Sequence, residues 1–319
     1  MTVAPAAPEP SVKRVPLGST GLEVPNLLLG AMRIEDLDDA AIRELVDTAR
    51  AAGVTYIDHA DIYGRELHGC ERRFADALRL SPAERDELTL QTKCGIVKGE
   101  SAFDFSYEHI VDSVEGSLAA LDTDRIDVLL LHRPDALVEP DEVARAFDEL
   151  HASGKVRAFG VSNHTPGQIE LLRRSLDQPI VVNQIQLSLV HASAIAQGIA
   201  ANMSDEQSVV RDGGGIVDYA RLHGITLQAW APFQGAAGVF LGSEQYTELN
   251  AVIDRIAARY GVEPIAVATA WLTRHPADIQ VVLGTTKPAR LAAAAHGSEL
   301  RLSRSEWYEL FRAAGHIVP

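Results

Sequence analysis

A run of polar side chains interrupts the apolar pattern at residues 56–64, Tyr-Ile-Asp-His-Ala-Asp-Ile-Tyr-Gly. The run begins with two apolar residues of strand character, and a carboxylate, Asp58, follows them directly. Tyr63 comes five residues later, and Gly64 closes the stretch. A carboxylate and a phenol suit a buried core poorly, because both groups need polar partners away from water. The pattern therefore predicts the mouth of a functional site.

Polar residues that could take part in catalysis or binding also end other apolar, strand-like stretches. They comprise a base, an imidazole, hydroxyl and amide groups and an indole. In a parallel barrel the chemistry collects at the carboxyl ends of the strands, so these residues would meet at one face. In chain order the strand ends carry Asp58, Lys93, His132, Ser162-Asn163, Gln184, Trp230 and Gly284-Thr285.

The elements that must position these residues alternate between short apolar strands and amphipathic helices. Eight strands are expected, at 27–29, 55–58, 88–93, 127–132, 158–162, 180–186, 226–230 and 280–283. Eight such units favour an α/β fold that closes into a parallel (β/α)8 TIM barrel. An open doubly wound sheet is the alternative, although no Gly-x-Gly-x-x-Gly follows any strand. A β-hairpin is expected before the barrel at 12–24, and two additional outer helices are expected at 264–275 and 303–314.

Composition narrows the class of protein further. The chain has 319 residues, of which 46% are hydrophobic, and a formal net charge of −15. This charge argues against nucleic acid or an anionic membrane surface as the main partner. Two cysteines, Cys70 and Cys94, fit a reducing compartment, and no apolar run reaches the roughly 18–20 residues of a membrane span. We expect a cytoplasmic protein with a disordered N-terminal lead at 1–11 and a single domain at 12–319.

Seven motifs in this order resemble the aldo-keto reductase family, and the resemblance runs from about residue 15 to the C-terminus. It looks closest to the bacterial oxidoreductases that carry the first and third of these motifs. The motifs are Asp58-His59-Ala60-Asp61-Ile62-Tyr63-Gly64, Gln91-Thr92-Lys93-Cys94-Gly95, Leu130-Leu131-His132-Arg133-Pro134-Asp135, Gly160-Val161-Ser162-Asn163, Asn183-Gln184, Ala229-Trp230-Ala231-Pro232 and Gly284-Thr285-Thr286-Lys287-Pro288-Ala289-Arg290.

The resemblance implies a catalytic tetrad for hydride transfer between a nicotinamide and an aldehyde or ketone, or an alcohol in reverse. Tyr63 matches the general acid, whose free phenol has a pKa of about 10 and is helped by a nearby cation. Lys93 matches that cation, Asp58 the carboxylate that holds it, and His132 the group that orients the carbonyl oxygen. Taken singly, Tyr63 also fits a tyrosine on the barrel rim, His132 a strand-end histidine and Asp58 a helix cap.

The resemblance also implies an extended nicotinamide dinucleotide, NADPH or NADP+, with NADH left open. Ser162, Asn163 and Gln184 match the residues that bind the carboxamide, and Trp230 matches the aromatic side chain that stacks on the nicotinamide. Ala231, Pro232 and Phe233 match the loop at the pyrophosphate. The group that matches the 2′-phosphate site is Gly284, Thr285, Thr286, Lys287 and Arg290, although the two cations also suit a solvated helical turn. Where many members carry Glu-Asn to reach the adenine, this chain has Ala293-Ala294.

Two other functions and one substrate question stay open from the sequence. A weakly catalytic, nicotinamide-sensing binding protein would keep the same tetrad. A metal-dependent barrel hydrolase would use Asp58, His59, Asp61, His68 and Cys70, whereas the aldo-keto reductase interpretation expects no metal. Arg133 would either attract an acidic substrate or form a salt bridge with Asp135 or Asp61.

Overall fold

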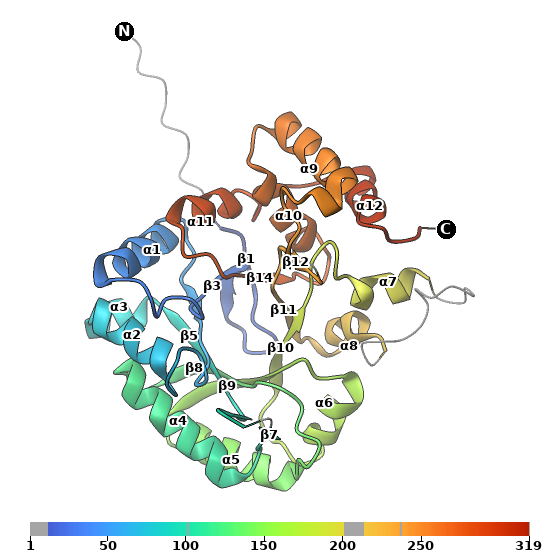
Figure 1. Cartoon of the computed structure of the whole chain (residues 1–319). Helices are drawn as coiled ribbons and strands as arrows, with labels where there is room; N and C mark the ends of the chain where they lie inside the picture. The colour runs from blue at the N-terminus through green and yellow to red at the C-terminus, as the bar shows by residue number, and fades with distance from the viewer. Residues whose placement is uncertain (1–11, 101, 201–213, 237, 319) are drawn as a thin grey trace.

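A closed barrel of eight parallel strands forms the centre of the molecule (Figure 1). The computed structural model describes residues 12–100, 102–200, 214–236 and 238–318; the expected lead at 1–11 lies outside them. The strands are hydrogen-bonded in the order β10-β11-β14-β3-β4-β5-β8-β9, and the ring closes between β9 and β10. The eight strands expected from the sequence are confirmed as β3 (Leu27–Gly30), β4 (Tyr56–Asp58), β5 (Thr89–Cys94), β8 (Ile126–Leu131), β9 (Val156–Ser162), β10 (Ile180–Gln186), β11 (Thr226–Trp230) and β14 (Gln280–Leu283).

A ring of helices surrounds the barrel (Figure 1). The first helix, α1, buries Ile42, Leu45, Val46 and Ala49 at helical spacing, and Asp38 caps it by accepting a hydrogen bond from Ala41 N at 2.8 Å. The helices are α1 (Asp39–Ala51), α2 (Gly69–Leu78), α3 (Pro82–Asp86), α4 (Tyr107–Leu121), α5 (Pro140–Ala152), α6 (Pro166–Arg173), α7 (Ser193–Ile199), α8 (Ile216–His223), α9 (Thr247–Tyr260), α10 (Pro264–Thr273), α11 (Pro288–Ala295) and α12 (Arg304–Ala313), with a 3-10 turn at Glu244–Tyr246.

Two helices of the described residues lie outside the helix ring, α9 and α12; the sequence predicted α12, at 303–314, but not α9. Every residue of α10 from Ala266 to Thr273 is buried, and this helix packs against β14 and α11. By contrast, α9 packs on α10 and α12. The indole of Trp271 stacks on that of Trp307 at 4.9 Å between ring centroids, which joins α12 to α10. The assignment of 264–275 to an outer helix is therefore wrong, because α10 occupies the helix ring.

The amino-terminal end of the barrel is closed by the expected hairpin, β1 (Arg14–Pro16) and β2 (Glu23–Pro25). Its turn is anchored to the barrel, because Gly18 N donates to Thr226 Oγ1 at 2.7 Å. Behind it lies a layer of buried apolar side chains inside the barrel. This layer is made of Leu17, Val24, Leu28, Tyr56, Val128, Leu130, Val181, Val182 and Val282.

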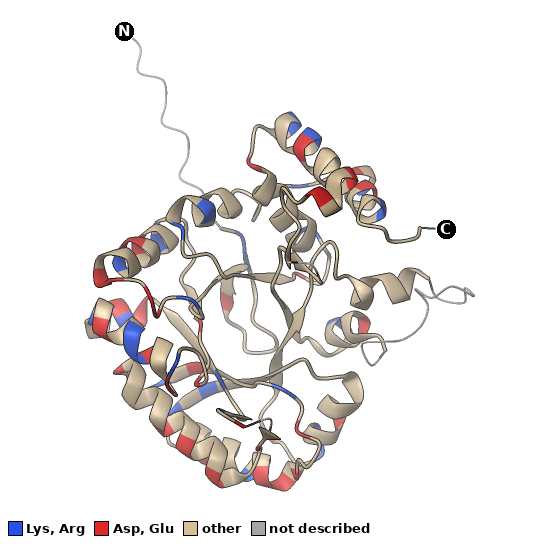
Figure 2. Cartoon of the chain, viewed as in Figure 1, with Lys and Arg blue, Asp and Glu red and all other residues tan. Residues whose placement is uncertain are grey.

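The opposite end of the barrel carries the longer connections and is the open one. Two short hairpins stand there, β6 (Ile96–Val97) with β7 (Ala102–Phe103) and β12 (Gln234–Gly235) with β13 (Gly238–Val239). Most charged residues lie on the helices around the barrel, with few in the ring of strands (Figure 2). Among the helices of the described residues, none has the length and apolarity needed to cross a membrane.

The close packing inside the barrel yields a test of the fold. A Cβ on Gly160 of β9 would lie 2.6 Å from Leu130 Cδ2 and 2.8 Å from the Val182 carbonyl oxygen. We expect Gly160→Ala to lower the free energy of unfolding by about 1–3 kcal/mol, since the strands must move apart. Gly167→Ala in α6 is the matched control, because nothing lies within 4 Å of its added Cβ. Urea denaturation of both variants checks this, and equal stability of the two would contradict the packing.

Candidate active site

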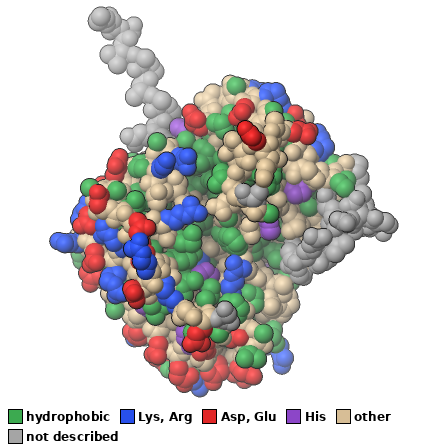
Figure 3. Space-filling model, in the orientation of Figure 1, with side chains coloured by type: hydrophobic (Ala, Val, Ile, Leu, Met, Phe, Trp, Pro, Cys, Tyr) green, Lys and Arg blue, Asp and Glu red, His purple; other side chains and the backbone are tan. Residues whose placement is uncertain are grey.

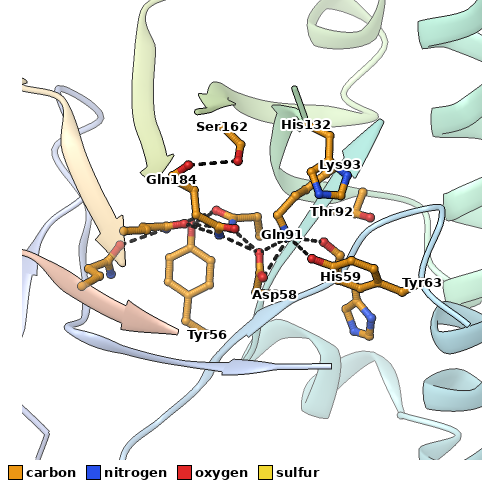
Figure 4. Close-up of polar contacts among 12 residues, drawn as sticks. Tyr56, Asp58, His59, Tyr63, Gln91, Thr92, Lys93, His132, Ser162 and Gln184 are labelled. Carbon is orange, nitrogen blue, oxygen red and sulfur yellow. Dashed lines mark hydrogen bonds and ion pairs between the residues drawn. The ribbon is translucent and has the colours of Figure 1, made fainter. Parts of the chain in front are cut away.

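An ion pair buried in the barrel forms the centre of the site (Figure 4). Lys93 Nζ donates to both carboxylate oxygens of Asp58, each at 2.8 Å, and also to the His59 carbonyl oxygen at 2.7 Å. The phenol oxygen of Tyr63 is 3.2 Å from the same nitrogen. The Lys93 side chain has no solvent exposure. Three residues of different types, separated along the chain, thus meet at one point.

The local charges hold these groups in defined protonation states. Burial works against the ammonium form of Lys93, but Asp58 and Tyr63 together outweigh it and raise the pKa of Lys93 above its ordinary value. Burial raises the pKa of Tyr63 as well, and the nearby Lys93 cation opposes this rise. The lysine is therefore a fixed cation, and the phenol holds its proton at neutral pH.

His132 completes this group from the end of β8. Its ring lies 5.9 Å from the Tyr63 ring between centroids, at an interplanar angle of 80°. Burial, the Lys93 charge and the Arg133 charge together lower the pKa of His132 well below its ordinary value. The imidazole is therefore neutral, and a neutral imidazole can donate a hydrogen bond to an oxygen in the pocket.

The loop that carries Tyr63 is held on both sides by Lys98, which the sequence analysis did not identify. Lys98 Nζ donates to the carbonyl oxygens of Ile62 and Gly64, each at 2.6 Å, so the β6–β7 hairpin grips the peptide groups around the tyrosine. Gly64 has a φ of +96°, and an added Cβ would lie 3.0 Å from Cys70 N. This turn therefore requires glycine.

A layer of glutamines lies beneath the ion pair, and the sequence analysis had named only Gln184 among the site residues. Gln91 Nε2 donates to Asp58 Oδ1 at 2.5 Å, and Gln184 Nε2 donates to the same oxygen at 3.1 Å. Both amides also donate to Gln228 Oε1, and Gln228 Nε2 in turn donates to Gln280 Oε1 at 3.0 Å. Figure 4 shows this network beside the ring of Tyr56, whose hydroxyl donates to Gln91 Oε1 at 2.9 Å. The layer fixes the carboxylate from below.

A signal for this layer does exist in the sequence. Successive side chains of a strand alternate between its two faces, so residues two apart share a face. Gln91 stands two before Lys93, Tyr56 two before Asp58, and Gln228 two before Trp230. Polar residues at this spacing inside otherwise apolar strands indicate a polar barrel interior below a strand-end site.

The residues expected at the nicotinamide carboxamide lie together on β9, β10 and β11. Ser162 Oγ donates to the Gln184 carbonyl oxygen at 2.9 Å, and Asn163 Nδ2 donates to Ser162 Oγ at 2.8 Å. Trp230 Nε1 donates to Asn163 Oδ1 at 3.0 Å. Asn163 and Ala231 both have left-handed backbone, with φ of +60° and +48°. Such conformations of non-glycine residues gather at functional sites, where surrounding contacts hold them.

One pocket of about 960 Å³ joins nearly all of the residues expected in the site. Lys93 is absent from its lining, because it is buried beneath the floor. The pocket lining includes Asp58, Tyr63, His132, Ser162, Asn163, Gln184, Trp230, Ala231, Pro232, Phe233, Gly284, Thr285, Thr286, Lys287 and Arg290.

One end of the pocket has the donor set of an anion site. Lys287 precedes the first residue of α11, and Arg290 lies in its first turn. Both side chains are exposed, and among the described residues neither is in an ion pair. Helix N-termini and cations both favour phosphate groups. Two carboxylates that the sequence analysis did not identify, Asp254 and Glu263, line the pocket as well, together with Ala293.

The residues of the metal-hydrolase alternative do not form a metal site. Asp58 forms an ion pair with Lys93, and Cys70 Sγ donates to the Met32 carbonyl oxygen at 3.4 Å. His68 Nδ1 lies 2.6 Å from Glu71 Oε2, within a buried cluster of its own. In the described part of the chain, no group of three or more His, Cys, Asp or Glu residues could hold a metal ion.

Comparisons with known proteins agree with this geometry. The sequence model of the Aldo/keto reductase family matches residues 26–313. A 6-dehydroglucose reductase from Agrobacterium fabrum is 36% identical over 307 residues, which cover 93% of this chain and 96% of the relative. Oxidoreductase YdhF from Escherichia coli is 35% identical over 321 residues, which cover 97% of this chain and 100% of the relative. A solved thermostable aldo-keto reductase in complex with the inhibitor epalrestat has a TM-score of 0.76 at 24% identity and covers 95% of this chain and 100% of its own.

The solved structure agrees with the parallel α/β barrel, and the family model and the curated relatives define the class as oxidoreductase. The chain belongs to the aldo/keto reductase family. The resemblance seen in the motifs is thereby confirmed at the level of the family.

The buried ion pair yields a prediction about stability. Asp58→Asn leaves the Lys93 cation unpaired, and breaking a buried pair on one side costs about 3–5 kcal/mol. We expect the free energy of unfolding to fall by that order in urea titrations. The double variant Asp58→Asn/Lys93→Met should recover part of the loss, because no buried charge remains. A single variant as stable as the wild type would show that the pair is not the constraint described.

Proposed function

We propose that the protein reduces aldehydes or ketones with NADPH, and oxidises the alcohols in reverse. The observation that carries the proposal is the contact of Lys93 Nζ with both Asp58 and the phenol of Tyr63 at the pocket floor. A buried tyrosine beside a fixed cation is suited to giving up its proton to a developing alkoxide. Membership of the aldo/keto reductase family supports the same reaction class.

The roles of the residues follow from their protonation states. The bound nicotinamide would supply the hydride that reduces the carbonyl carbon. Tyr63 gives its proton to the carbonyl oxygen, and Lys93 stabilises the phenolate that remains. Neutral His132 donates a hydrogen bond to the same oxygen and orients it. Asp58 keeps Lys93 charged and in place, so it acts through the lysine.

The pocket offers a place for each part of the dinucleotide. Ser162, Asn163 and Gln184 provide amide and hydroxyl groups for the carboxamide, beside the indole of Trp230. At the far end, Lys287 and Arg290 stand at the start of α11 with two threonine hydroxyls, which suits the 2′-phosphate of NADPH. Ala293 has no polar group to reach the adenine. Asp254 and Glu263 line the same pocket and carry hydrogen-bond acceptors, so they are candidates to bind the adenosine hydroxyls or amine.

A cytoplasmic location is part of the proposal. Cys70 and Cys94 are both buried free thiols. Burial raises the pKa of Cys70 to about 11 and that of Cys94 well above its ordinary value, so both are inert thiols. Such a pair suits a reducing compartment.

Replacement of the proposed acid gives the decisive test. Tyr63→Phe removes the proton donor and keeps the ring, so kcat for a reactive aldehyde should fall about 10²- to 10⁴-fold. NADPH binding, followed by quenching of protein fluorescence, should persist in the variant. Activity retained in Tyr63→Phe would contradict the assignment. Tight NADPH binding by the wild type without turnover of a broad carbonyl panel would favour the nicotinamide-sensing alternative.

Cofactor preference has its own test at the start of α11. Arg290→Ala removes a charged donor, and such a donor to a phosphate is worth about a tenfold to hundredfold change in affinity. The dissociation constant for NADPH should rise by that factor, and the constant for NADH should stay nearly constant. Isothermal titration calorimetry with both nucleotides measures this. Equal losses for the two nucleotides would exclude a 2′-phosphate contact.

A further inference from the structure

Arg133 lies in the pocket, and no carboxylate of the described residues pairs with its charge. It follows His132 directly at the end of β8, it is half-buried, and it lines the pocket. Its guanidinium lies 5.5 Å from the centroid of the Trp230 indole, so the planar group is held against an aromatic face. Within the described residues, this guanidinium forms no hydrogen bond and no ion pair.

The two salt bridges that the sequence allowed for Arg133 are both absent. Asp135 uses one carboxylate oxygen to accept from Phe105 N at 3.1 Å and the other to accept from Leu137 N at 2.8 Å. Asp61 is buried next to Glu71, away from the pocket lining. The expectation of a structural salt bridge is therefore wrong, because both acids have other surroundings. Arg133 keeps its full donor capacity for something in the pocket.

The charges around the pocket favour an anion as that partner. Arg33, between β3 and α1, lines the same pocket and is likewise in no ion pair within the described part of the chain. The acids of the lining are Asp58, neutralised by Lys93, and Asp254 and Glu263, which come from α9 and the start of α10. Figure 3 shows basic side chains around an apolar hollow on this face. In a chain of net charge −15, two cations without a carboxylate partner in one pocket are unexpected.

We propose that Arg133 binds an anionic group of the substrate, and that the preferred substrates are short carbonyl compounds that carry a carboxylate or a similar oxyanion. This inference rests on the proposed reductase function and specifies its substrate class. His132 and Arg133 both line the pocket, so an anion at Arg133 and a carbonyl at His132 would share one cavity. A guanidinium grips a carboxylate with two parallel hydrogen bonds, which orients the substrate as well as attracting it.

The surroundings of Arg133 strengthen this interaction. Met32, Ile62 and Ile96 give the pocket apolar walls, so an ion pair there is less screened than one at the surface. The Arg133 charge also contributes to the lowered pKa of His132. A bound carboxylate would offset that contribution and couple substrate charge to the imidazole.

A matched pair of substrates tests the charge preference. Succinic semialdehyde carries a carboxylate three carbons from its aldehyde, and its methyl ester has the same chain without the charge. The readout is the ratio of kcat/KM for acid and ester with NADPH, because a general loss of activity cancels in that ratio. We expect the wild type to favour the acid about tenfold to hundredfold.

Three variants assign the preference to the guanidinium. Arg133→Met should bring the ratio to within about threefold of one, and Arg133→Lys should give an intermediate ratio, since it keeps the charge but loses the fork. Arg145→Gln, on the exposed face of α5, is the matched control and should keep the wild-type ratio. Melting temperatures and NADPH dissociation constants, measured for all variants, show whether fold and cofactor binding survive.

The outcomes distinguish failure of the anion site at Arg133 from failure of the reductase function. Reduction of both substrates without preference, or a preference that survives in Arg133→Met, overturns the anion site and leaves the reductase intact. If Arg133→Met loses NADPH affinity but keeps the acid-to-ester ratio of kcat/KM, the arginine binds the cofactor, and the anion site for the substrate is again overturned. No turnover of either compound or of a wider carbonyl panel contradicts the reductase function itself, and the anion site with it.

Discussion

The buried ion pair of Lys93 and Asp58 is the interaction on which the rest of the site depends. Two charges without contact with water are stable only if each has opposite charge and hydrogen bonds around it. Here the carboxylate accepts from two glutamine amides as well as the lysine, and the lysine also donates to a carbonyl oxygen and reaches the phenol of Tyr63. The pair therefore ties β4 to β5 and holds the Lys93 cation beside the phenol of Tyr63.

The barrel interior is arranged in layers of different polarity below that pair. Apolar side chains fill the amino-terminal end behind the hairpin, and glutamine amides form the next layer up. Amides donate and accept without carrying charge, so they stabilise Asp58 without competing with Lys93 for it. The polarity thus rises toward the mouth, from aliphatic side chains through amides to the ion pair and the open pocket. This gradient explains how a packed core and a charged site share one barrel.

The strands and the family were predictable from the sequence because they depend on local patterns, namely short apolar runs and the residues that end them. Of the two outer helices, α12 was predicted as well, but α9 was not. The segment of α9 is amphipathic and looks like a ring helix, whereas α10, Pro-Ile-Ala-Val-Ala-Thr-Ala-Trp-Leu-Thr, has no polar face and belongs inside. Likewise Asp135 looked like a partner for Arg133 because it is near in sequence, but its two oxygens accept from the backbone amides of Leu137, two residues on, and of Phe105, in a distant loop. Contacts of that kind arise only in three dimensions.

The closed floor of the barrel has a consequence for how protons travel. The hairpin and the apolar layer seal the end away from the pocket, and the glutamines above them have no acidic proton to pass on. Water can therefore approach the phenol of Tyr63 only through the mouth, which is where a bound molecule would sit. In the reaction proposed above, Tyr63 would therefore regain a proton from water only after the product has left the mouth.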